Sequence, residues 1–341
     1  MKLMLIGFGV VGQGLVMILH DKADDLKTRY GFSPQVVGVA TGSRGILYNA
    51  NGLSLQKLLG AGQAGTLAHY PDEDGLERDF VDALDLIQNR DADVLVEVSP
   101  TNIRTAMPAM QHLQEAIATG KHIVTANKGP VAIGFKALLQ QAKEANVHIR
   151  YESTLMAGTP AIATGLETLA GSTIQSARGI VNGTTNYILT EMENGLTYDD
   201  ALSRAQQLGY AETDPTADVE GYDAAAKVLI MLNAFFGIEA SLDDIDVMGI
   251  TSITPEAILA ATEANERYKL IASATPQGGQ VKLVRLPLND PLAHVKGATN
   301  ALTFETDLMG DVTVMGAGAG QQETGLGLLA DLLAIHRIVS V

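Results

Sequence analysis

The chain has 341 residues, of which 46% are hydrophobic and 18% charged, so it carries enough apolar side chains for the cores of two domains. Its formal net charge of -16 excludes broad contact with nucleic acid or with an anionic membrane surface, but it is compatible with a small anion site built from backbone N–H groups. The absence of cysteine excludes disulfides, thiolate catalysis and cysteine-based metal sites.

Strand-like and helix-like segments alternate through the first 150 residues. Short apolar runs at residues 2–6, 35–40, 94–98, 122–125 and 147–151 are typical of strands. Residues 10–19, 103–119 and 131–145 have the periodicity of helices. This alternation predicts βαβ units and a parallel sheet with helices on both faces.

The pattern changes after Glu152. Glycine-rich loops are expected at 156–160 and 182–186, a helix after Thr197 with Asp200 in a capping box, and a longer helix over 221–236. Residues 269–275 and 280–287 are typical of adjacent strands joined by 276–279, and a final helix follows the 316–320 loop through residue 333. We therefore expect an α/β domain of residues 1–151 with 301–341, and an α+β domain of residues 152–300 with an antiparallel sheet.

The sequence shows neither a targeting signal nor a membrane-spanning segment. The N-terminus has no apolar stretch followed by a cleavage site, and no apolar run approaches the roughly 18 residues of a membrane helix. We therefore expect a soluble, cytoplasmic protein. The seven histidines form no HxxxH or HExxH pair, so no catalytic zinc site is expected.

A glycine motif follows the first strand and opens the first helix. Gly7 permits a tight turn, Gly9 lets the backbone approach a pyrophosphate, and Gly12 lets the helix pack on the strand. The helix N-terminus then favours the anion. The alternative is an ordinary glycine-rich turn, but the position of the motif favours a Rossmann-type dinucleotide site.

The end of the second strand bears on the choice of cofactor. An NAD site usually has an acidic residue there, whereas this strand runs into Ala40-Thr41-Gly42-Ser43-Arg44 without one. Arg44 is suited to a 2′-phosphate, with Lys57 either as a second cation or as a solvated helix charge. The sequence therefore favours NADP over NAD.

A lysine and several acids follow residue 208. Asp223 and Lys227 are four residues apart on one helix and have apolar neighbours, so they form either a partly buried proton donor or a surface salt bridge. Glu212 and Asp218 lie upstream and suit a substrate ammonium, or cap the following helix. For Asp214, which precedes a proline, we favour a turn-forming role.

The segment from Gly209 through Lys227 resembles the signature of homoserine dehydrogenases. Further matching stretches occur in the same order along the chain, at residues 7–12, 125–128, 152–160, 182–188 and 316–320. The resemblance spans essentially the whole chain. It implies a Rossmann-type nucleotide-binding domain and a catalytic and dimerisation domain, with NAD(P)H-dependent interconversion of L-aspartate 4-semialdehyde and L-homoserine in threonine, methionine and isoleucine biosynthesis.

The resemblance also implies roles for particular residues. Lys227 would donate or accept the proton, Asp223 would hold the homoserine hydroxyl or a bridging water, and Lys128 would stabilise carboxylate or oxyanion charge. The expected substrate-binding residues are Glu212, Asp218, Tyr210 and Thr184, with Thr185 as an alternative to Thr184.

Cofactor and cation contacts follow by the same analogy. The implied cofactor contacts are Gly7, Phe8, Gly9, Val10, Val11, Gly12, Ser99, Pro100, Thr101, Lys128, Gly209 and Gly318. A monovalent cation, usually sodium, would take the Glu152 carboxylate and the carbonyls of Leu155, Ala157 and Thr159. The alternative is that these are structural loop residues and a solvated glutamate.

Two rival functions and two features of the family bear on this interpretation. One rival is another amino-acid or hydroxy-acid dehydrogenase on the same scaffold, and the other is a protein that binds NADP without chemistry. The acids near residue 212 argue against a simple hydroxy acid, and the Asp223/Lys227 pair argues against binding alone. No aspartokinase or ACT segment is expected, so we expect no threonine feedback through such a domain. A homodimer is implied by the resemblance.

Overall fold

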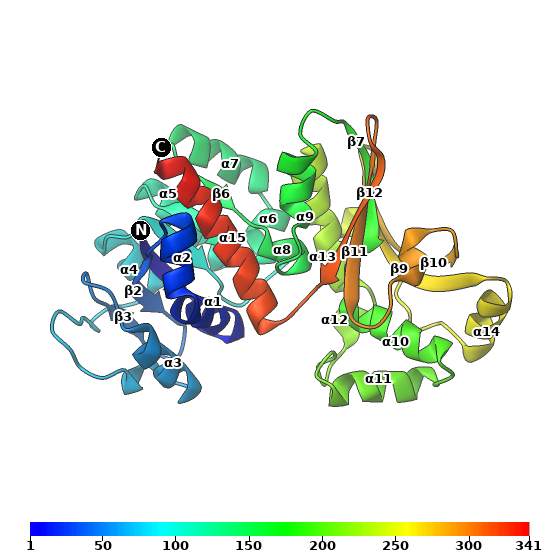
Figure 1. Ribbon diagram of the computed structural model, residues 1–341, viewed down its shortest axis with the longest axis horizontal. Coiled ribbons are helices and arrows are strands. Elements are labelled where there is room, and N and C mark those ends of the chain that lie inside the picture. The colour runs from blue at the N-terminus through cyan, green and yellow to red at the C-terminus, as the bar shows by residue number, and fades with distance from the viewer. Residues whose placement is uncertain (341) are drawn as a thin grey trace. The chain divides into compact units, whose positions relative to one another are not determined.

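The computed structural model of the chain describes residues 1–340 (Figure 1). It divides into two compact units. The first comprises Met1–Gly158 with the C-terminal segment from Gly320, and the second comprises Thr159–Ala319. Over the described residues, no helix combines the length and the apolar character needed to cross a bilayer.

The first unit contains the predicted parallel sheet. Its strand order is β3-β2-β1-β4-β5-β6, and all neighbours run parallel except β3, which pairs antiparallel with β2 at one edge. The expectation of a Rossmann-type α/β fold is therefore confirmed, with one antiparallel edge strand added. The strands are β1 (Lys2–Ile6), β2 (Gln35–Ala40), β3 (Ile46–Tyr48), β4 (Val94–Glu97), β5 (His122–Thr125) and β6 (Ile149–Arg150).

Helices cover both faces of this sheet. Helices α1 and α15 pack together on one face, and α4 and α5 pack on the other (Figure 1). The helices of the unit are α1 (Val10–Asp21), α2 (Ala23–Tyr30), α3 (Leu55–Gln63), η1 (Leu67–His69), α4 (Ala83–Asn89), α5 (Ala109–Ala118), α6 (Lys128–Ala132), α7 (Phe135–Glu144), α8 (Ser153–Met156) and α15 (Gln321–Val339).

Glycines let the last helix pack closely on the first. A Cβ on Gly14 would lie 2.2 Å from the Gln321 carbonyl oxygen, and a Cβ on Gly325 would lie 2.8 Å from the Gly14 carbonyl carbon. The C-terminal helix therefore belongs to the first unit. It is longer than the sequence indicated, because it continues past residue 333 to Val339.

Two other helix predictions in this unit were wrong in part. The helix expected over 103–119 begins only at Ala109, because Pro108 disfavours helical backbone at the residue before it. The helix expected over 131–145 is split into α6 and α7 at Gly134, whose φ of 70° is left-handed.

The second unit is built on a mostly antiparallel sheet, as expected for α+β structure. Its order is β12-β11-β7-β9-β10-β8, and only β10 and β8 run parallel. Strands β9 and β10 form the predicted hairpin. Strands β11 and β12 join this sheet, although the sequence had suggested that residues 301–319 go with the nucleotide-binding domain. The strands are β7 (Ile174–Ile180), β8 (Asp246–Val247), β9 (Glu266–Thr275), β10 (Gly278–Pro287), β11 (Thr299–Thr306) and β12 (Gly310–Ala317).

Helices of the second unit carry the residues that the sequence singled out. Residues 182–186, expected as a loop, instead start helix α10, because the Asn182 side chain caps it by accepting from Thr185 N. The helices are α9 (Ala161–Ala163), η2 (Thr164–Thr168), α10 (Gly183–Glu193), α11 (Tyr198–Gln207), α12 (Thr216–Val219), α13 (Tyr222–Met231), η3 (Leu232–Phe236), η4 (Leu242–Asp244), α14 (Pro255–Glu263) and η5 (Pro291–His294).

Candidate active site

Two of the three motif glycines are required by the packing of the backbone around them, whether or not a ligand is bound. Gly7, directly after β1, has a φ of 104°, and a Cβ there would lie 2.4 Å from the Val98 carbonyl oxygen. A Cβ on Gly12 would lie 2.8 Å from the Gly7 carbonyl oxygen. Larger residues at these two positions would therefore push the turn away from the strands and the helix.

Gly9 is different, because nothing in the protein demands a glycine there. It precedes α1 with a φ of -83°, and no heavy atom lies within 4 Å of the position that its Cβ would take. The first turn of α1 has no acidic residue, and Val10 beside it is 66% exposed. Open space at a glycine on a helix N-terminus fits the backbone approach of a pyrophosphate, so the residues present fit a dinucleotide.

Phe8 cannot contact a cofactor with its ring, because that side chain is only 3% exposed and packs in the core of the unit. Its expected contact is therefore limited to the backbone. Loops after β4 and β5 carry Ser99 and Lys128, the latter as the first residue of α6. Asn127, which the sequence analysis missed, donates from its Nδ2 to the Ser99 carbonyl oxygen at 3.0 Å and so links these two loops.

Arg44 lies in a tight turn after β2. Its backbone N–H donates to the Thr41 hydroxyl oxygen at 2.8 Å, and that hydroxyl donates to the Gly45 carbonyl oxygen at 3.1 Å. The Arg44 side chain is exposed, and its guanidinium makes no hydrogen bond or ion pair within residues 1–340. An exposed guanidinium at this strand end is suited to a 2′-phosphate.

Lys57, expected as a second cation near Arg44, is engaged elsewhere. Its Nζ lies 2.7 Å from Glu73 Oε2. Hydrogen bonds from Lys57 and from the Tyr70 hydroxyl hold the pKa of the Glu73 carboxyl below its ordinary value. The structure therefore provides Arg44 alone as a cation with no partner among the described residues at the end of β2.

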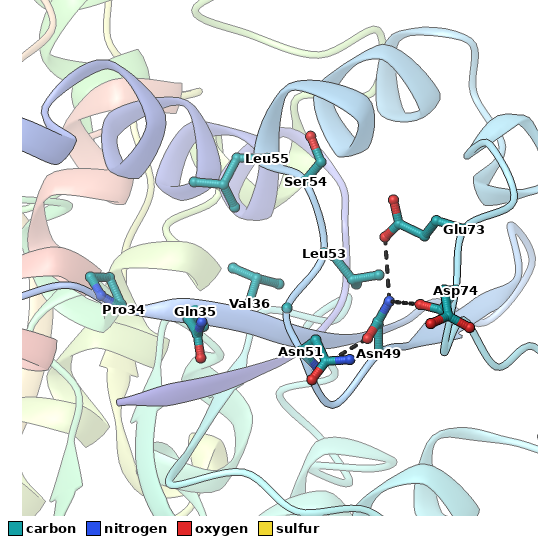
Figure 2. A pocket seen from close by; sticks show the side chains of 11 residues that line it. Pro34, Gln35, Val36, Asn49, Asn51, Leu53, Ser54, Leu55, Glu73 and Asp74 are labelled. Carbon is teal, nitrogen blue, oxygen red and sulfur yellow. Dashed lines mark hydrogen bonds between the residues drawn. The ribbon is translucent and has the colours of Figure 1, made fainter.

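Glu73 lines a pocket of about 400 Å³ beside the start of β2 (Figure 2). The Asn49 side chain points between Glu73 and Asp74 and donates to the Asp74 carbonyl oxygen at 3.0 Å. Ligands of open α/β sheets bind outside the carboxyl ends of the strands, and this pocket adjoins the amino end of β2. It is not the candidate active site. Its lining is Pro34, Gln35, Val36, Asn49, Asn51, Gly52, Leu53, Ser54, Leu55, Glu73 and Asp74.

The predicted lysine of the second unit is buried. Lys227 on α13 is 7% exposed, and every residue from Ala224 to Met231 is buried with it. Its Nζ donates to the Val181 carbonyl oxygen at 2.5 Å and to Asp223 Oδ2 at 2.8 Å. The pair is therefore a largely buried ion pair and not the surface salt bridge that the spacing also allowed.

Asn182 joins the two aspartates of this cluster. Its Nδ2 donates to Asp218 Oδ1 at 2.6 Å and to Asp223 Oδ2 at 3.0 Å, and its Oδ1 accepts from Thr185 N at 2.9 Å. Asn182 was not among the predicted site residues, although an asparagine directly before a helix is itself a capping signal.

The environment of Asp218 perturbs the pKa of its carboxyl. Burial raises the pKa of its carboxyl, the Asn182 hydrogen bond acts against this, and the nearby Asp223 carboxylate adds to the rise. Thr184 faces the same segment, because its hydroxyl donates to the Tyr210 carbonyl oxygen at 2.5 Å. Thr185 is fully buried and bonds back to Asn182, so Thr184 is the threonine beside the 208–218 segment.

Two other acids, Glu212 and Asp214, make no hydrogen bond to this cluster within residues 1–340. Glu212 is exposed, and its carboxylate has no hydrogen bond or ion pair within the described chain. Asp214 caps the following turn, because its Oδ1 accepts from Thr216 N at 3.1 Å, which confirms the turn-forming role. Gly209 has a left-handed φ of 77° just before Tyr210, whose ring is 46% exposed.

The expected cation ligands fall in both units. Glu152, Leu155 and Ala157 belong to the first unit, and Glu152 is 4% exposed. Thr159 belongs to the second, where its hydroxyl donates to the Ala317 carbonyl oxygen at 2.9 Å. Residues 1–340 hold no group of three or more histidines or acids placed to bind a metal. Gly318 is also in the second unit.

Comparisons with known proteins agree on one family. The family model described as the NAD binding domain of homoserine dehydrogenase matches residues 7–152, and the homoserine dehydrogenase model matches residues 160–333. A homoserine dehydrogenase of Methanocaldococcus jannaschii is 43% identical, with 98% of each chain covered. An NAD(+)-dependent homoserine dehydrogenase of Pseudomonas canavaninivorans is 40% identical, with 98% of this chain and 96% of that protein covered.

Solved structures give the same result. A putative homoserine dehydrogenase of Archaeoglobus fulgidus superposes with a TM-score of 0.88 at 37% identity, covering 98% of this chain and 99% of that one. A hyperthermophilic archaeal homoserine dehydrogenase in complex with NADPH has a TM-score of 0.83 at 28% identity, covering 100% of this chain and 98% of that one.

Gly9→Ala tests the position of the cofactor. A methyl group there meets no protein atom, so the melting temperature should stay within about 2 °C of wild type, while NADPH affinity should fall about tenfold because the pyrophosphate loses its close approach. Fluorescence titration with NADPH and thermal unfolding measure the two effects.

Gly60→Ala, at an exposed helical glycine with nothing within 4 Å of its Cβ position, is the matched control and should leave the NADPH affinity unchanged without lowering the melting temperature. Unchanged NADPH affinity in Gly9→Ala would show that the dinucleotide binds elsewhere.

Proposed function

The chain belongs to the homoserine dehydrogenase family, and from this premise we propose which of its residues carry the reaction. The reaction is the NAD(P)-dependent interconversion of L-homoserine and L-aspartate 4-semialdehyde. The comparisons do not favour another dehydrogenase on the same scaffold. The observation that carries the assignment of roles is the buried Lys227 ammonium held by Asp223 and a backbone carbonyl.

Lys227 acts as the proton donor in aldehyde reduction and as the acceptor in the reverse direction. Its ammonium has three N–H groups, and the described partners use two of them, so one is left for the substrate oxygen. The bound nicotinamide supplies or takes the hydride at the carbon. As the aldehyde carbon gains its new C–H bond, Lys227 gives its proton to the oxygen and becomes neutral. Asp223 orients the ammonium by accepting one of its hydrogen bonds.

The substrate ammonium is bound by Asp218. This carboxylate is held by Asn182, and the backbone of Tyr210 is fixed nearby through Thr184. Glu212 is the second acid proposed for the ammonium, and its exposure leaves it accessible. In the first unit, we assign to Lys128 the stabilisation of carboxylate or oxyanion charge.

Lys227→Met removes the proton donor while keeping an unbranched side chain. Turnover should fall by roughly 100- to 10,000-fold, whereas the Kd for NADPH should change less than about twofold. Steady-state kinetics and a fluorescence titration measure these quantities. Lys282→Met, at a partly exposed lysine of β10 paired with Asp246, is the control and should retain full turnover. Retention of most of the rate by Lys227→Met would refute the role.

The raised pKa of Asp218 predicts that homoserine binding weakens as the pH falls. Because its pKa is raised, the carboxylate is protonated at a higher pH than an ordinary aspartate, so binding is present above that raised pKa and lost as the pH falls through it. The KM for homoserine should rise on the acid side in wild type and in the exposed control Asp311→Asn. Asp218→Asn should have a high KM for homoserine at every pH, without the additional rise on the acid side. Identical pH profiles in all three proteins would contradict the assignment.

Cofactor choice depends on Arg44. We propose NADP as the preferred cofactor, with NAD also accepted. Arg44→Ala should raise the KM for NADPH about tenfold and leave that for NADH nearly unchanged, because only the former has a 2′-phosphate. Arg29→Ala, at another exposed arginine of the first unit, should alter neither value. Equal losses with both cofactors would count against a 2′-phosphate contact.

Three further properties remain proposals. A homodimer through the second sheet is supported by exposed apolar residues at its edge, where Leu308 is 72%, Met309 68% and Met315 63% exposed. Light scattering that gives a monomeric mass would contradict the dimer.

A sodium ion bound by Glu152 and the neighbouring carbonyls would make activity higher in a sodium salt than in a salt of a bulky organic cation. Cytoplasmic location and a role in threonine, methionine and isoleucine synthesis stay predictions, which cell fractionation and a growth test of a deletion strain would check.

A further inference from the structure

A buried acid and a buried histidine lie at the carboxyl end of β4, and the reaction above does not use them. Glu97, the last residue of β4, is 0% exposed, and His112 on α5 is 6% exposed. His112 Nδ1 donates to Glu97 Oε2 at 2.7 Å. Burying a carboxylate costs free energy unless a hydrogen-bonding partner is buried with it. An apolar pair would fill the same space at a lower cost, which suggests that Glu97 and His112 have a specific role.

The second carboxylate oxygen of Glu97 holds the loop that follows. Glu97 Oε1 accepts from Ser99 N at 2.8 Å, and the Ser99 carbonyl oxygen accepts from Asn127 Nδ2 at 3.0 Å. The Glu97 carbonyl oxygen also accepts from the Thr125 hydroxyl at 3.0 Å. The start of this loop is therefore fixed from β4, from α5 and from the end of β5.

The peptide between Val98 and Ser99 is the wall against which the glycine turn packs. A Cβ on Gly7 would lie 2.4 Å from the Val98 carbonyl oxygen and 2.7 Å from Ser99 N. The N–H group that Glu97 holds is thus the same group that lies against Gly7. A shift of this wall would move the turn, and with it the N-terminus of α1.

We propose that Glu97 and His112 are positioning residues, which hold the wall of the dinucleotide site in place and thereby set the affinity for the nicotinamide cofactor. Glu97 accepts a hydrogen bond from the wall directly, through Ser99 N. This bond places the Glu97 carboxylate in the protein interior, where His112 donates a hydrogen bond to it. The inference rests on dinucleotide binding at the glycine turn, which Gly9→Ala tests independently.

Three single variants separate positioning from general stability. Glu97→Leu removes the acceptor and should raise the Kd for NADPH about tenfold, whereas Glu97→Gln keeps an acceptor oxygen and should stay within about threefold of wild type. The matched control is Lys121→Met. Lys121 is also buried in this unit, 5% exposed, but it lies directly before β5, at the amino ends of the parallel strands, and it donates to the Ile87 carbonyl oxygen. Lys121→Met should lower the melting temperature without changing the Kd for NADPH.

The readouts are the NADPH Kd by fluorescence titration, kcat for aldehyde reduction at saturating NADPH and the KM for L-aspartate 4-semialdehyde. Only the Kd should change by more than about threefold, because a general loss of structure would also lower kcat. An unchanged Kd in Glu97→Leu would overturn the proposal, and so would an equal rise in Lys121→Met.

A suppressor pair keeps the test decisive if Glu97→Leu fails to fold. His112→Leu leaves the Glu97 carboxylate buried without its partner and should weaken NADPH binding. Adding Glu97→Gln removes that charge while an oxygen still accepts from Ser99 N, so the double variant should regain affinity to within about threefold of wild type. Failure of the second substitution to restore the Kd would overturn the proposal.

Discussion

Burying the Lys227 ammonium requires the chain to replace the hydrogen bonds that water would have made. The Val181 carbonyl oxygen and the Asp223 carboxylate do so at 2.5 and 2.8 Å. Val181 directly follows β7, and Asp223 lies one helical turn before Lys227. The ammonium can therefore be buried only if α13 packs with Lys227 beside the end of β7. The same buried and largely apolar environment makes a proton on this amine useful to a reacting oxygen.

A single side-chain amide extends this arrangement to the substrate. Asn182 donates to Asp223, which holds the lysine, and to Asp218, which we assign to the substrate ammonium. Two carboxylates sharing one donor repel each other, which contributes to the raised pKa of Asp218 and favours a cation between or beside them. The geometry of binding and that of proton transfer are therefore fixed by one residue at the start of α10.

Local patterns in the sequence predicted the parts that depend on neighbouring residues. The glycine turn and the Asp223/Lys227 pair follow from short spacings, and both were found as expected. Asn182 was missed because its bonds reach residues 36 and 41 positions away. Strand β7 was missed for a similar reason, since its partners β9 and β11 are distant in sequence, whereas β11 and β12 form a local hairpin that was overlooked. The ion pair of Lys57 with Glu73 likewise joins residues that no local pattern relates.

The most direct test of the central claim is a crystal structure of the enzyme with homoserine and an oxidised nicotinamide cofactor bound together. The account predicts the homoserine hydroxyl within about 3.2 Å of Lys227 Nζ and the substrate ammonium against the Asp218 carboxylate. A homoserine hydroxyl bound to another group, with Lys227 still closed off by Val181 and Asp223 alone, would contradict it.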